Sequence, residues 1–528
     1  MRRRATALLL LFILAAWAPA LSTVGASDAS IVTNTTWSGD VTLTGNLTVE
    51  GPAVLTLEPG TVVDADIYAI HVINGGVVIA DDARLTSTAP VTSQGSHGSG
   101  LWPGLTVDSS SSAYLNSTEI ERAETCLHLE GALEANDLTL QNCYIGLDVT
   151  GSATAEVDTL HVEQADVFAV RNKGTLDLLN QARLHNVSIG LQSEGATYVA
   201  DLEVEDALQG VKAVSGTASI HGLTATSNKI ALGASAGATL EAHDVTVRDS
   251  GLAVDASDAT SLTVDVLDVS TTGTLLQGRN VAGLSLSNVT ASISDGGAAT
   301  KAIDLPCSGT CHLSTASLAL DNATVHVSGS GTTGFTEVLL HAVNTTRPVL
   351  EATGTGTFDA DTMTVLGEGG VLFRDLDTSI QDMHVDLGQG EGPAVDLMAG
   401  DHVWGDVVLE RRYSAFDFSS QGLVARYATM HANALSATNL STGVHLDATH
   451  FASIMLSSLD GRNVGVMLDQ STLSVDNLDT RLSTTGVEAE ASSLHAMDWL
   501  ADRHQLGLSL NDASTATVRT FDASGGTG

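Results

Sequence analysis

Apolar and polar residues alternate near the start of the chain. In the stretch TWSGDVTLTGNLTVEGPAVLTLEPGTVV (36–63), Val41 and Leu43 form one alternating pair, and Leu47 and Val49 form the next. Gly-Asn, Gly-Pro and Pro-Gly pairs interrupt these runs. Alternation between turn-forming pairs is typical of short strands with one buried face. The pattern therefore predicts short strands whose apolar side chains point into a shared interior.

A phrase of the form Gly-apolar-x-apolar recurs through the chain. Neighbouring phrases lie about 20 to 22 residues apart, and a second short alternating run precedes them, such as DLTL at 137–140. The phrases are GLDV at 146, GVKA at 210, GLAV at 251, GVHL at 443, GVML at 465, GVEA at 486 and GLSL at 507, with the glycine-free variants LHL at 127 and FAV at 168. This self-similarity predicts a repeat architecture.

A period of about 21 residues with two or three short strands predicts an all-β fold, a right-handed single-stranded parallel β-helix. Each coil would lie about 4.8 Å from the next, so residues 40–519 would form roughly 22 coils and a rod about 100 Å long. Leucine-rich repeats have a similar period, but their Leu-x-x-Leu-x-Leu frame is absent. A β-propeller needs about 40 residues per blade and more aromatic residues than this chain has.

The chain resembles the extracellular parallel β-helix repeat family, in the non-catalytic or uncharacterised part of the broad pectate-lyase-like superfamily. The resemblance covers residues 37–519. It rests on the 36–63 stretch, which is similar to the N-terminal segment of many such surface proteins, and on WPGLTV at 102–107 followed by the repeats. It implies the fold but little about function, because the family includes lyases, hydrolases, adhesins and proteins of unknown role.

The repeat and its irregularities divide the chain into six expected segments. Trp37 is the expected plug of a cap that covers the open edge of the first coil. The steps between phrases lengthen after Gly278, which predicts insertions in the turns. Nothing resembling a cap follows the last coil, which indicates a truncated sequence or an end that a partner covers. The segments are a signal peptide (1–26), an N-terminal cap segment (27–39), regular coils (40–277), coils with longer turns (278–400), regular coils (401–519) and a tail (520–528).

The first residues have the three parts of a secretory signal peptide. Three arginines (2–4) form a basic start, an apolar run covers residues 7–17, and small residues permit cleavage after Ala20 or Ala26. The run is short for a membrane span, so we expect export, with an uncleaved anchor as the alternative. No later segment is long and apolar enough to span a bilayer. The mature protein is therefore predicted to be secreted or to lie at the extracellular cell surface.

The chain is strongly acidic, with 62 acidic and 22 basic residues and a formal net charge of −40. Such a surface repels polyanions, so nucleic acid, polyuronates and anionic membranes are poor ligands unless a metal bridges them. The favoured explanation is solubility in a salty environment, and a divalent-cation function is the alternative. The expected partners are surface glycans or other surface proteins.

Several acidic or amide residues recur at multiples of the period. In register they would stack near the start of one strand, where carboxylates one coil apart could share a calcium ion. The favoured interpretation is structural, because Asp and Asn are common in turns and cap backbone N–H groups there. The sequence therefore requires no cofactor and leaves calcium as a candidate ligand. The residues are Asp137, Asp158, Asn180, Asp201 and Asp244.

Export makes the four cysteines candidates for disulfides. Cys307 and Cys311 flank a tight turn in PCSGTC, which favours a local bridge. Cys126 and Cys143 would occupy neighbouring coils, where a disulfide and two buried free thiols are equally good interpretations.

Asn-X-Ser/Thr sequons would be reachable by a glycosylating export pathway, although several are expected to be chance matches. They begin at Asn34, Asn46, Asn116, Asn186, Asn288, Asn322, Asn344 and Asn439.

Basic and aromatic residues concentrate in one region, which is a candidate sugar-contact patch. The alternative is a surface turn with ion pairs. The patch residues are Trp404, Arg411, Arg412, Tyr413, Arg426 and Tyr427.

A separate motif, GASAG (233–237), matches the GxSxG form of a nucleophile elbow, but a turn in a β-coil is not the strand-turn-helix context that this motif needs.

Two functions follow from these patterns. The favoured one is a non-enzymatic secreted or cell-surface rod with a structural, adhesive or carbohydrate-contacting role and no identifiable catalytic residues. The alternative is a polysaccharide lyase or glycoside hydrolase, which would need carboxylates and an Arg, Lys or His that converge in a groove. The 17 histidines show no HExxH arrangement, which makes a zinc enzyme a poor candidate.

Overall fold

We describe the fold from a computed structural model. The predicted signal peptide (1–26) lies outside the described residues except for two positions, and so does the end of the predicted tail (525–528). The structure describes residues 23–24, 29–90, 101–235, 237–271, 273–294, 300–412, 420–449 and 451–524.

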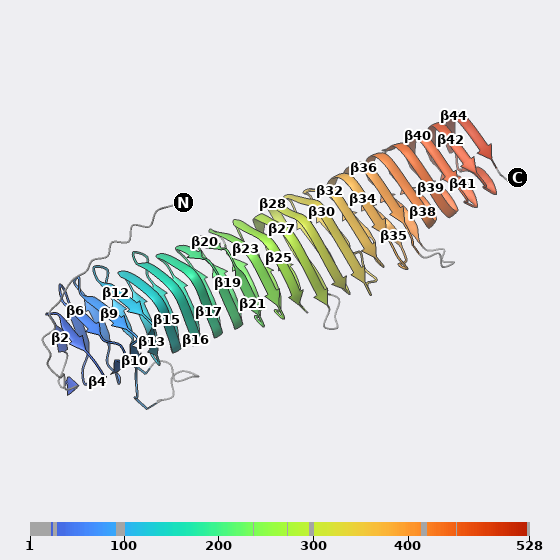
Figure 1. The fold of residues 1–528 in the computed structure, drawn as a ribbon. Coiled ribbons are helices and arrows are strands. Elements are labelled where there is room, and N and C mark those ends of the chain that lie inside the picture. Colours follow the sequence, from blue (N-terminus) through green and yellow to red (C-terminus); the bar gives the residue numbers. More distant parts are fainter. Residues whose placement is uncertain are drawn as a thin grey trace, which may run out of the picture.

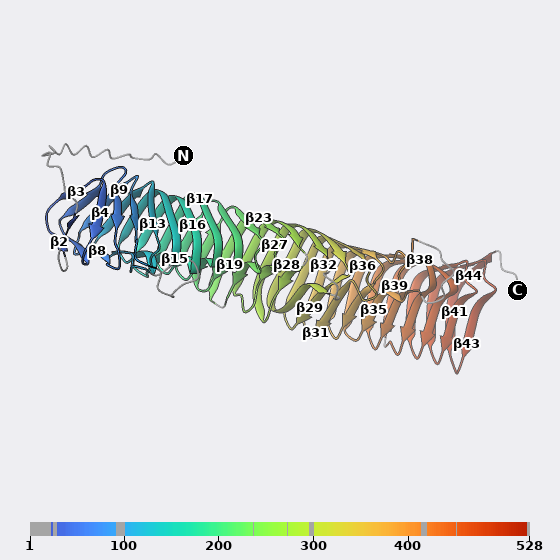
Figure 2. The same cartoon turned by 90° about the horizontal axis from the view of Figure 1, so that it is seen from below.

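The described residues form only strands and connecting turns, arranged as a parallel β-helix of about 21 turns. The coils stack along one axis into an elongated rod, with β2 (Ala29–Ile31) near one end and β44 (Thr515–Ser524) at the other (Figure 1). A view from a second side shows the same continuous stack (Figure 2). In the described part of the chain there is no helix with the length and apolarity to cross a membrane. The predicted all-β parallel β-helix is confirmed.

Each N-terminal coil contains three short strands, which define three faces of the solenoid. The strands are β1 (Thr23–Val24), β2 (Ala29–Ile31), β3 (Thr35–Trp37), β4 (Asp40–Leu43), β5 (Leu47–Glu50), β6 (Val54–Leu57), β7 (Val62–Asp64), β8 (Ile70–Ile73), β9 (Val77–Asp81), β10 (Arg84–Thr86), β11 (Leu105–Val107), β12 (Ser112–Asn116), β13 (Thr118–Glu121) and β14 (Thr125–Leu129). We call the ladder that contains β3 and β6 face 1, the ladder of β4 and β7 face 2, and the ladder of β5 and β8 face 3. Alternate side chains are buried, as the pattern predicts: Leu47 and Val49 of β5 point inward.

From β15 onward, strands of one coil join into longer, bent strands. They are β15 (Ala132–Val149), β16 (Thr154–Asn172), β17 (Thr175–Ser193), β18 (Ala196–Val199), β19 (Leu202–Ala213), β20 (Gly216–Ile220), β21 (Leu223–Thr226), β22 (Ile230–Ala234), β23 (Ala238–Arg248), β24 (Leu252–Asp255), β25 (Ser261–Thr271), β26 (Thr274–Gln277), β27 (Val281–Ser294) and β28 (Thr300–Asp321). β15 pairs with β12 on face 1, with β13 on face 2 and with β14 on face 3. Residues with positive φ, such as Asn142 and Asn186, turn the chain between faces 2 and 3. Asparagine is common at such corners because it tolerates this conformation.

In the C-terminal half, most coils combine one long strand over faces 1 and 2 with one short strand on face 3. The strands are β29 (Ala323–Gly329), β30 (Thr332–Val343), β31 (Leu350–Gly354), β32 (Thr357–Gly367), β33 (Val371–Arg374), β34 (Asp377–Asp386), β35 (Pro393–Met398), β36 (Asp401–Glu410), β37 (Gln421–Arg426), β38 (Thr429–Asp447), β39 (Phe451–Asp469), β40 (Thr472–Arg481), β41 (Thr485–Glu490), β42 (Ser493–Asp502), β43 (Leu506–Asn511) and β44 (Thr515–Ser524). β38 and β39 cross all three faces. The same three ladders therefore continue along the rod.

The Gly-apolar-x-apolar phrases lie in register on face 3. Val444, Val466, Val487 and Leu508 follow one another along the ladder, one coil apart, and the central two are 0% exposed. The predicted repeat is therefore confirmed in these coils. The phrase at Gly251 is an exception, because its position in the ladder is shifted relative to the phrase at Gly210.

Coil length varies more than the sequence pattern indicates. Leu276 pairs with Ile303, and the long step between them lies partly in the region where longer turns are expected. The step from Ile70 to its partner Leu105 is longer still. This second insertion lies in a segment (40–277) that the sequence pattern treats as regular, so the expectation of uniform coils there is wrong.

The expected N-terminal cap is part of the first coil in its described residues. β2 pairs with β5, and β3 pairs with β6. Trp37 lies opposite Leu57 in the ladder and is 7% exposed. The indole therefore fills the interior as a plug would, but from a strand in register and not from a separate cap.

One hydrophobic core runs along the rod. From Trp37 to Ala501, buried apolar side chains form a single cluster. In the middle coils aromatic rings contact each other from coil to coil, with ring centroids 4.9 Å apart for Phe335 and Phe358 and 5.2 Å apart for Phe358 and Phe373. Since each coil contacts mainly its neighbours, stability adds up along the axis.

Glycine precedes the inward residues of the phrases because the coils approach closely there. A Cβ atom on Gly465 would lie 2.7 Å from the carbonyl oxygen of Gly486 and 3.0 Å from Cγ2 of Thr480. Such contacts are too short without movement of the backbone. Gly465 therefore sets the spacing of two coils.

Gly465→Ala is expected to destabilise the C-terminal coils by about 1 to 2 kcal/mol, the usual cost of forcing extra atoms into a packed site. Chemical denaturation followed by circular dichroism measures the change. Gly151→Ala is the matched control, because a Cβ atom there would meet only the Lys173 carbonyl oxygen, at 3.9 Å. Equal stability of the two variants would contradict the close approach.

Candidate functional site

A row of polar side chains crosses face 3 over five consecutive coils. Each coil contributes one residue in register with the next: His128 from β14, Asp148 from β15, Arg171 from β16, Gln192 from β17 and Lys212 from β19. Their strand neighbours point into the core, so these side chains belong to the outer side of the sheet. We call these five residues the face 3 row.

Asp148 is the centre of the face 3 row. Its side chain is only 4% exposed. Oδ2 lies 2.9 Å from Nδ1 of His128, and Arg171 donates two hydrogen bonds of 2.7 Å, one to each carboxylate oxygen. Burial by itself would raise the pKa of Asp148, but the hydrogen bonds from His128 and Arg171 lower this pKa from 3.8 to about 2.

His128 and Arg171 are held in place by this carboxylate. The hydrogen bond to Asp148 raises the pKa of His128 above 6.5, against the opposing effect of burial. Glu130 raises this pKa further, because its Oε1 lies 3.6 Å from Nε2 of His128. The Arg171 guanidinium also lies over the Phe168 ring, 5.5 Å from its centroid, a favourable cation–π contact. Three successive coils are thus joined by one charge-assisted cluster around a buried carboxylate.

The cluster links neighbouring coils through ionic hydrogen bonds and is not arranged for catalysis; we call the His128–Asp148–Arg171 group a clamp. A general base needs an accessible lone pair and a pKa near the working pH. Both oxygens of Asp148 accept charge-assisted hydrogen bonds, and a pKa of about 2 makes the carboxylate a weak base. The arrangement stabilises the contact between coils and orients Arg171 along the face. Sequence reasoning missed this cluster because its three members are far apart along the chain. The one available signal was that they are spaced by about one repeat of 21 residues.

A second cluster of similar composition lies further along face 3. Asp304 of β28 pairs in register with His326 of β29. Oδ1 of Asp304 lies 2.7 Å from Nδ1 of His326 and accepts a hydrogen bond of 3.0 Å from Lys301. Burial opposes ionisation, yet these partners lower the pKa of Asp304. Ionised aspartates with a histidine and a second cation therefore recur on this face.

The stability contributed by the face 3 row is expected to depend on pH in both directions. The folded-state pKa of Asp148, about 2, lies below its ordinary value, so its contribution is present above about pH 4 and is lost as the pH falls toward 2. The folded-state pKa of His128 is raised, so its contribution is complete below 6.5 and is lost as the pH rises through the folded pKa.

Thermal unfolding of the wild type and of Asp148→Asn between pH 2 and pH 9 measures this contribution. The difference between the two melting temperatures should be largest between about pH 4 and pH 6.5 and should shrink on both sides. Taking the difference removes the effect of the remaining acidic residues, which is common to both proteins. A difference that does not change with pH would contradict the assigned ionisation states.

The candidate calcium residues do not form one continuous stack. Asp158 is displaced by one residue from the rung that Asp137 occupies. Gly222 stands beside Asp201, on the coil between Asp201 and Asp244. Within the described ranges no group of three or more His, Cys, Asp or Glu side chains is arranged to hold a metal ion. Calcium binding stays a prediction.

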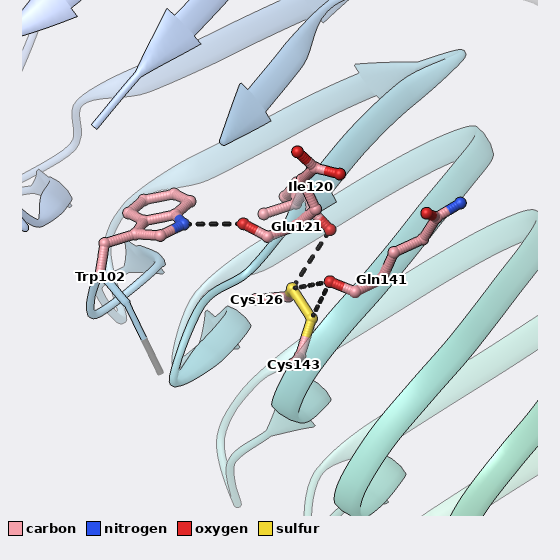
Figure 3. The surroundings of a disulfide bond; sticks show 6 residues. All are labelled: Trp102, Ile120, Glu121, Cys126, Gln141 and Cys143. Atoms are coloured by element: carbon pink, nitrogen blue, oxygen red, sulfur yellow. Dashed lines mark hydrogen bonds between the residues drawn. A yellow bond between two sulfur atoms is a disulfide. The ribbon is translucent and has the colours of Figure 1, made fainter. Parts of the chain in front are cut away.

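Both cysteine pairs are disulfides. Cys126 and Cys143 lie in adjacent coils with Cα atoms 5.8 Å apart, and Cys307 and Cys311 are 6.2 Å apart. For the first pair, this spacing favours the bridge over two free thiols. Figure 3 shows the first bridge beside the backbone of its coil, with Sγ of Cys126 3.2 Å from the Ile120 carbonyl oxygen. The bond covalently joins two coils within the N-terminal third.

Trp102 is hydrogen-bonded to β13, the strand whose Ile120 carbonyl also contacts this disulfide. Its Nε1 donates a hydrogen bond of 2.8 Å to the carbonyl oxygen of Glu121 (Figure 3). The indole is 2% exposed. The WPGLTV stretch that contributed to the family resemblance therefore begins with a residue that packs into the core.

The residues of the candidate sugar-contact patch do not form one exposed surface in the structure. Trp404 is 2% exposed, and its Nε1 donates a hydrogen bond of 2.8 Å to Thr378, so it cannot contact an outside ligand. Arg411 is also buried, at 4% exposure. Including these two residues in an exposed patch is wrong, and for Trp404 the reason is the alternation along β36, which turns the indole inward.

The remaining patch residues are engaged or lie apart. Arg412 pairs with Asp386 at 2.9 Å, and Arg426 pairs with Asp396 at 2.7 Å. The ion pairs match the surface-turn alternative. Tyr427 is 64% exposed, and Tyr413 lies outside the described residues.

The GASAG motif begins in the last two residues of a strand. Gly233 and Ala234 end β22, and β23 begins at Ala238. The described part of this motif therefore lacks the helix that a nucleophile elbow needs. This agrees with the interpretation of the motif as a chance match.

The sequon asparagines lie at corners of the coils. All have exposed side chains except Asn322, which is half-buried. The amides of Asn288 and Asn344 each donate a hydrogen bond of 2.7 Å to an aspartate of the preceding coil. Positive φ gives a structural reason for asparagine at Asn186, Asn288, Asn322, Asn344 and Asn439.

The fold and these clusters define a class, a long parallel β-helix with ionic clamps on one face. No protein-family model matches the chain, and no curated protein matches it. The structure establishes the fold. Because these comparisons match nothing, membership of the pectate-lyase-like superfamily stays a prediction.

Proposed function

We propose that this protein is an exported, rod-shaped structural or adhesive protein that contacts carbohydrates or other surface proteins. The observation that carries the proposal is the stacking of about 21 parallel coils around one core. Such a stack transmits load along its hydrogen-bond ladders and presents long, regular faces to partners. The charge clamps on face 3 reinforce the contact between coils.

Two features support export. The residues 1–26 have the pattern of a secretory signal peptide. Both cysteine pairs are bridged, which is typical of proteins in oxidising compartments. Separately from export, a net charge of −40 keeps a long rod soluble and discourages self-association.

The alternative, a polysaccharide lyase or glycoside hydrolase, needs a free carboxylate or another base that faces substrate. Asp148 is the carboxylate of the face 3 row, and its hydrogen bonds occupy both of its oxygens. This observation favours a structural role for the row. The experiment below separates the two functions.

The test uses the full chain, secreted with its own leader. Calorimetric titration and thermal melting are performed with Ca²⁺ and then with neutral and acidic oligosaccharides, and the same samples are assayed for new reducing ends and unsaturated products. Saturable binding without cleavage supports the rod. Cleavage would overturn the proposal in favour of the enzyme, and retention inside the producing cell would contradict export.

A further inference from the structure

A shallow groove runs along the corner between faces 2 and 3, over the four coils from β16 to β22. Its polar part has a volume of about 430 Å³. An adjoining apolar part of about 360 Å³ shares four residues with it. We call this feature the Asn186 groove. Its polar wall is formed by Asp166, Asn186, Ser188, Asp206, Ser227 and Lys229.

The apolar wall contains one strongly exposed aliphatic side chain. Leu208 is 62% exposed and lies beside Val167, Ile189 and Ile230. A large aliphatic side chain at the surface and convergent polar groups beside it form a surface on which a partly apolar ligand can lie. An anionic ligand is disfavoured, because the chain as a whole repels anions.

Asn186 begins the sequon Asn186-Val187-Ser188 and stands in the wall of this groove. Its side chain is exposed, and among the described residues its amide has no hydrogen-bonding partner. Asn288 and Asn344 differ, because their amide nitrogens already donate to aspartates. The Asn186 amide is therefore free where a hollow lies next to it.

We propose that Asn186 carries an N-linked glycan and that the Asn186 groove binds the first sugar residues of that glycan. This inference rests on the proposed function, because it requires export through a glycosylating pathway. Nδ2 of Asn186 forms a bond to the anomeric carbon of a lipid-phosphate-linked oligosaccharide. The bond from that carbon to the phosphate oxygen breaks, the amide nitrogen loses one proton, and the lipid phosphate leaves.

Sugar chemistry matches both walls of the groove. One face of a pyranose ring carries C–H groups, which can cover Leu208 and Ile189. Its hydroxyls can donate to the Asp206 carboxylate and accept from the Lys229 ammonium. Both side chains are exposed on the corner. The groove thus offers apolar contact and hydrogen bonds of both kinds, the usual composition of a small-ligand site.

The test is glycopeptide mass spectrometry of the full chain, secreted from a host with an N-glycosylating export pathway. Asn186 is expected to be occupied. Enzymatic removal of the glycan should then speed hydrogen exchange about threefold at the backbone N–H groups of residues 187–189 and 207–209. Removal avoids relying on a variant that fails to fold.

Asn439→Gln is the matched control variant for Asn186→Gln. Asn439 has an exposed side chain and a φ of 60°, against 53° for Asn186, and it lies at the corresponding corner of β38. Only Asn186→Gln should reproduce the faster exchange in the groove. Leu208→Ser should do so too while the glycan remains attached.

Three results would overturn the inference, and they separate it from the proposed function. A secreted protein with other sequons occupied and Asn186 unmodified would overturn the inference and leave the rod intact. An occupied Asn186 whose glycan removal leaves exchange unchanged would show that the sugars extend into solvent. A chain that is never exported would contradict the proposed function as well.

Discussion

Replacing Val466 by Asp is expected to unfold the C-terminal coils. Val466 is 0% exposed and lies in the face 3 ladder between Val444 and Val487. A carboxylate in that position would have no partner in an apolar interior, and the cost of burying an unpaired charge is several kcal/mol. We expect a loss of at least about 4 kcal/mol in the free energy of unfolding.

Hydrogen exchange measured strand by strand is the best readout, because a rod can lose a few coils while others stay folded. Exchange should accelerate most in β38, β39 and β41, which contain Val466 and its partners. Val403→Asp is the control, since Val403 is 56% exposed. If both variants are as stable as the wild type, the observed register is wrong.

Replacing Asp148 by Asn is expected to cost about 3 kcal/mol, at the lower end for a broken buried ion pair. The substitution leaves Arg171 and His128 without their shared anion. Their side chains are 27% and 30% exposed, so water replaces part of the lost interaction. The loss should be concentrated in β14, β15 and β16, the three strands that the cluster joins.

A double-mutant cycle with Arg171→Gln isolates the pair. If the clamp interpretation is correct, the double variant should be more stable than the sum of the two single changes predicts, by more than about 1 kcal/mol. Asp158→Asn is the control for loss of an acidic charge alone, because Asp158 is exposed. Additive effects of the two single substitutions would show that Asp148 and Arg171 do not act together.

Local sequence periodicity was sufficient to predict the architecture. Alternation with a period of two determines which side chains are buried, and the longer repeat of the phrases determines that strands stack in parallel. Val466 and Val487 could therefore be placed in the core from the sequence. Cys307 and Cys311 could be paired because they lie close together along the chain, on either side of one tight turn.

Alternation fails where both faces of a strand carry apolar residues. In β36 Val403 and Trp404 are adjacent and both apolar, and only one of them can point inward. The structure buries Trp404 and exposes Val403. Placing Trp404 in the expected sugar patch was wrong for this reason, since a one-residue choice moves a side chain to the opposite face.

The sequence by itself determined the fold class, the repeat and the interior positions of this protein, because those depend on short-range patterns. Only the tertiary structure decided which residues of different coils meet. Along the face 3 ladder Leu127 lies opposite Leu147, and Leu147 lies opposite Val170, so the second of these two coils is longer than the first. Such variation shifts every contact between coils, so the His128–Asp148–Arg171 clamp and the Asn186 groove become visible only once the coils are stacked.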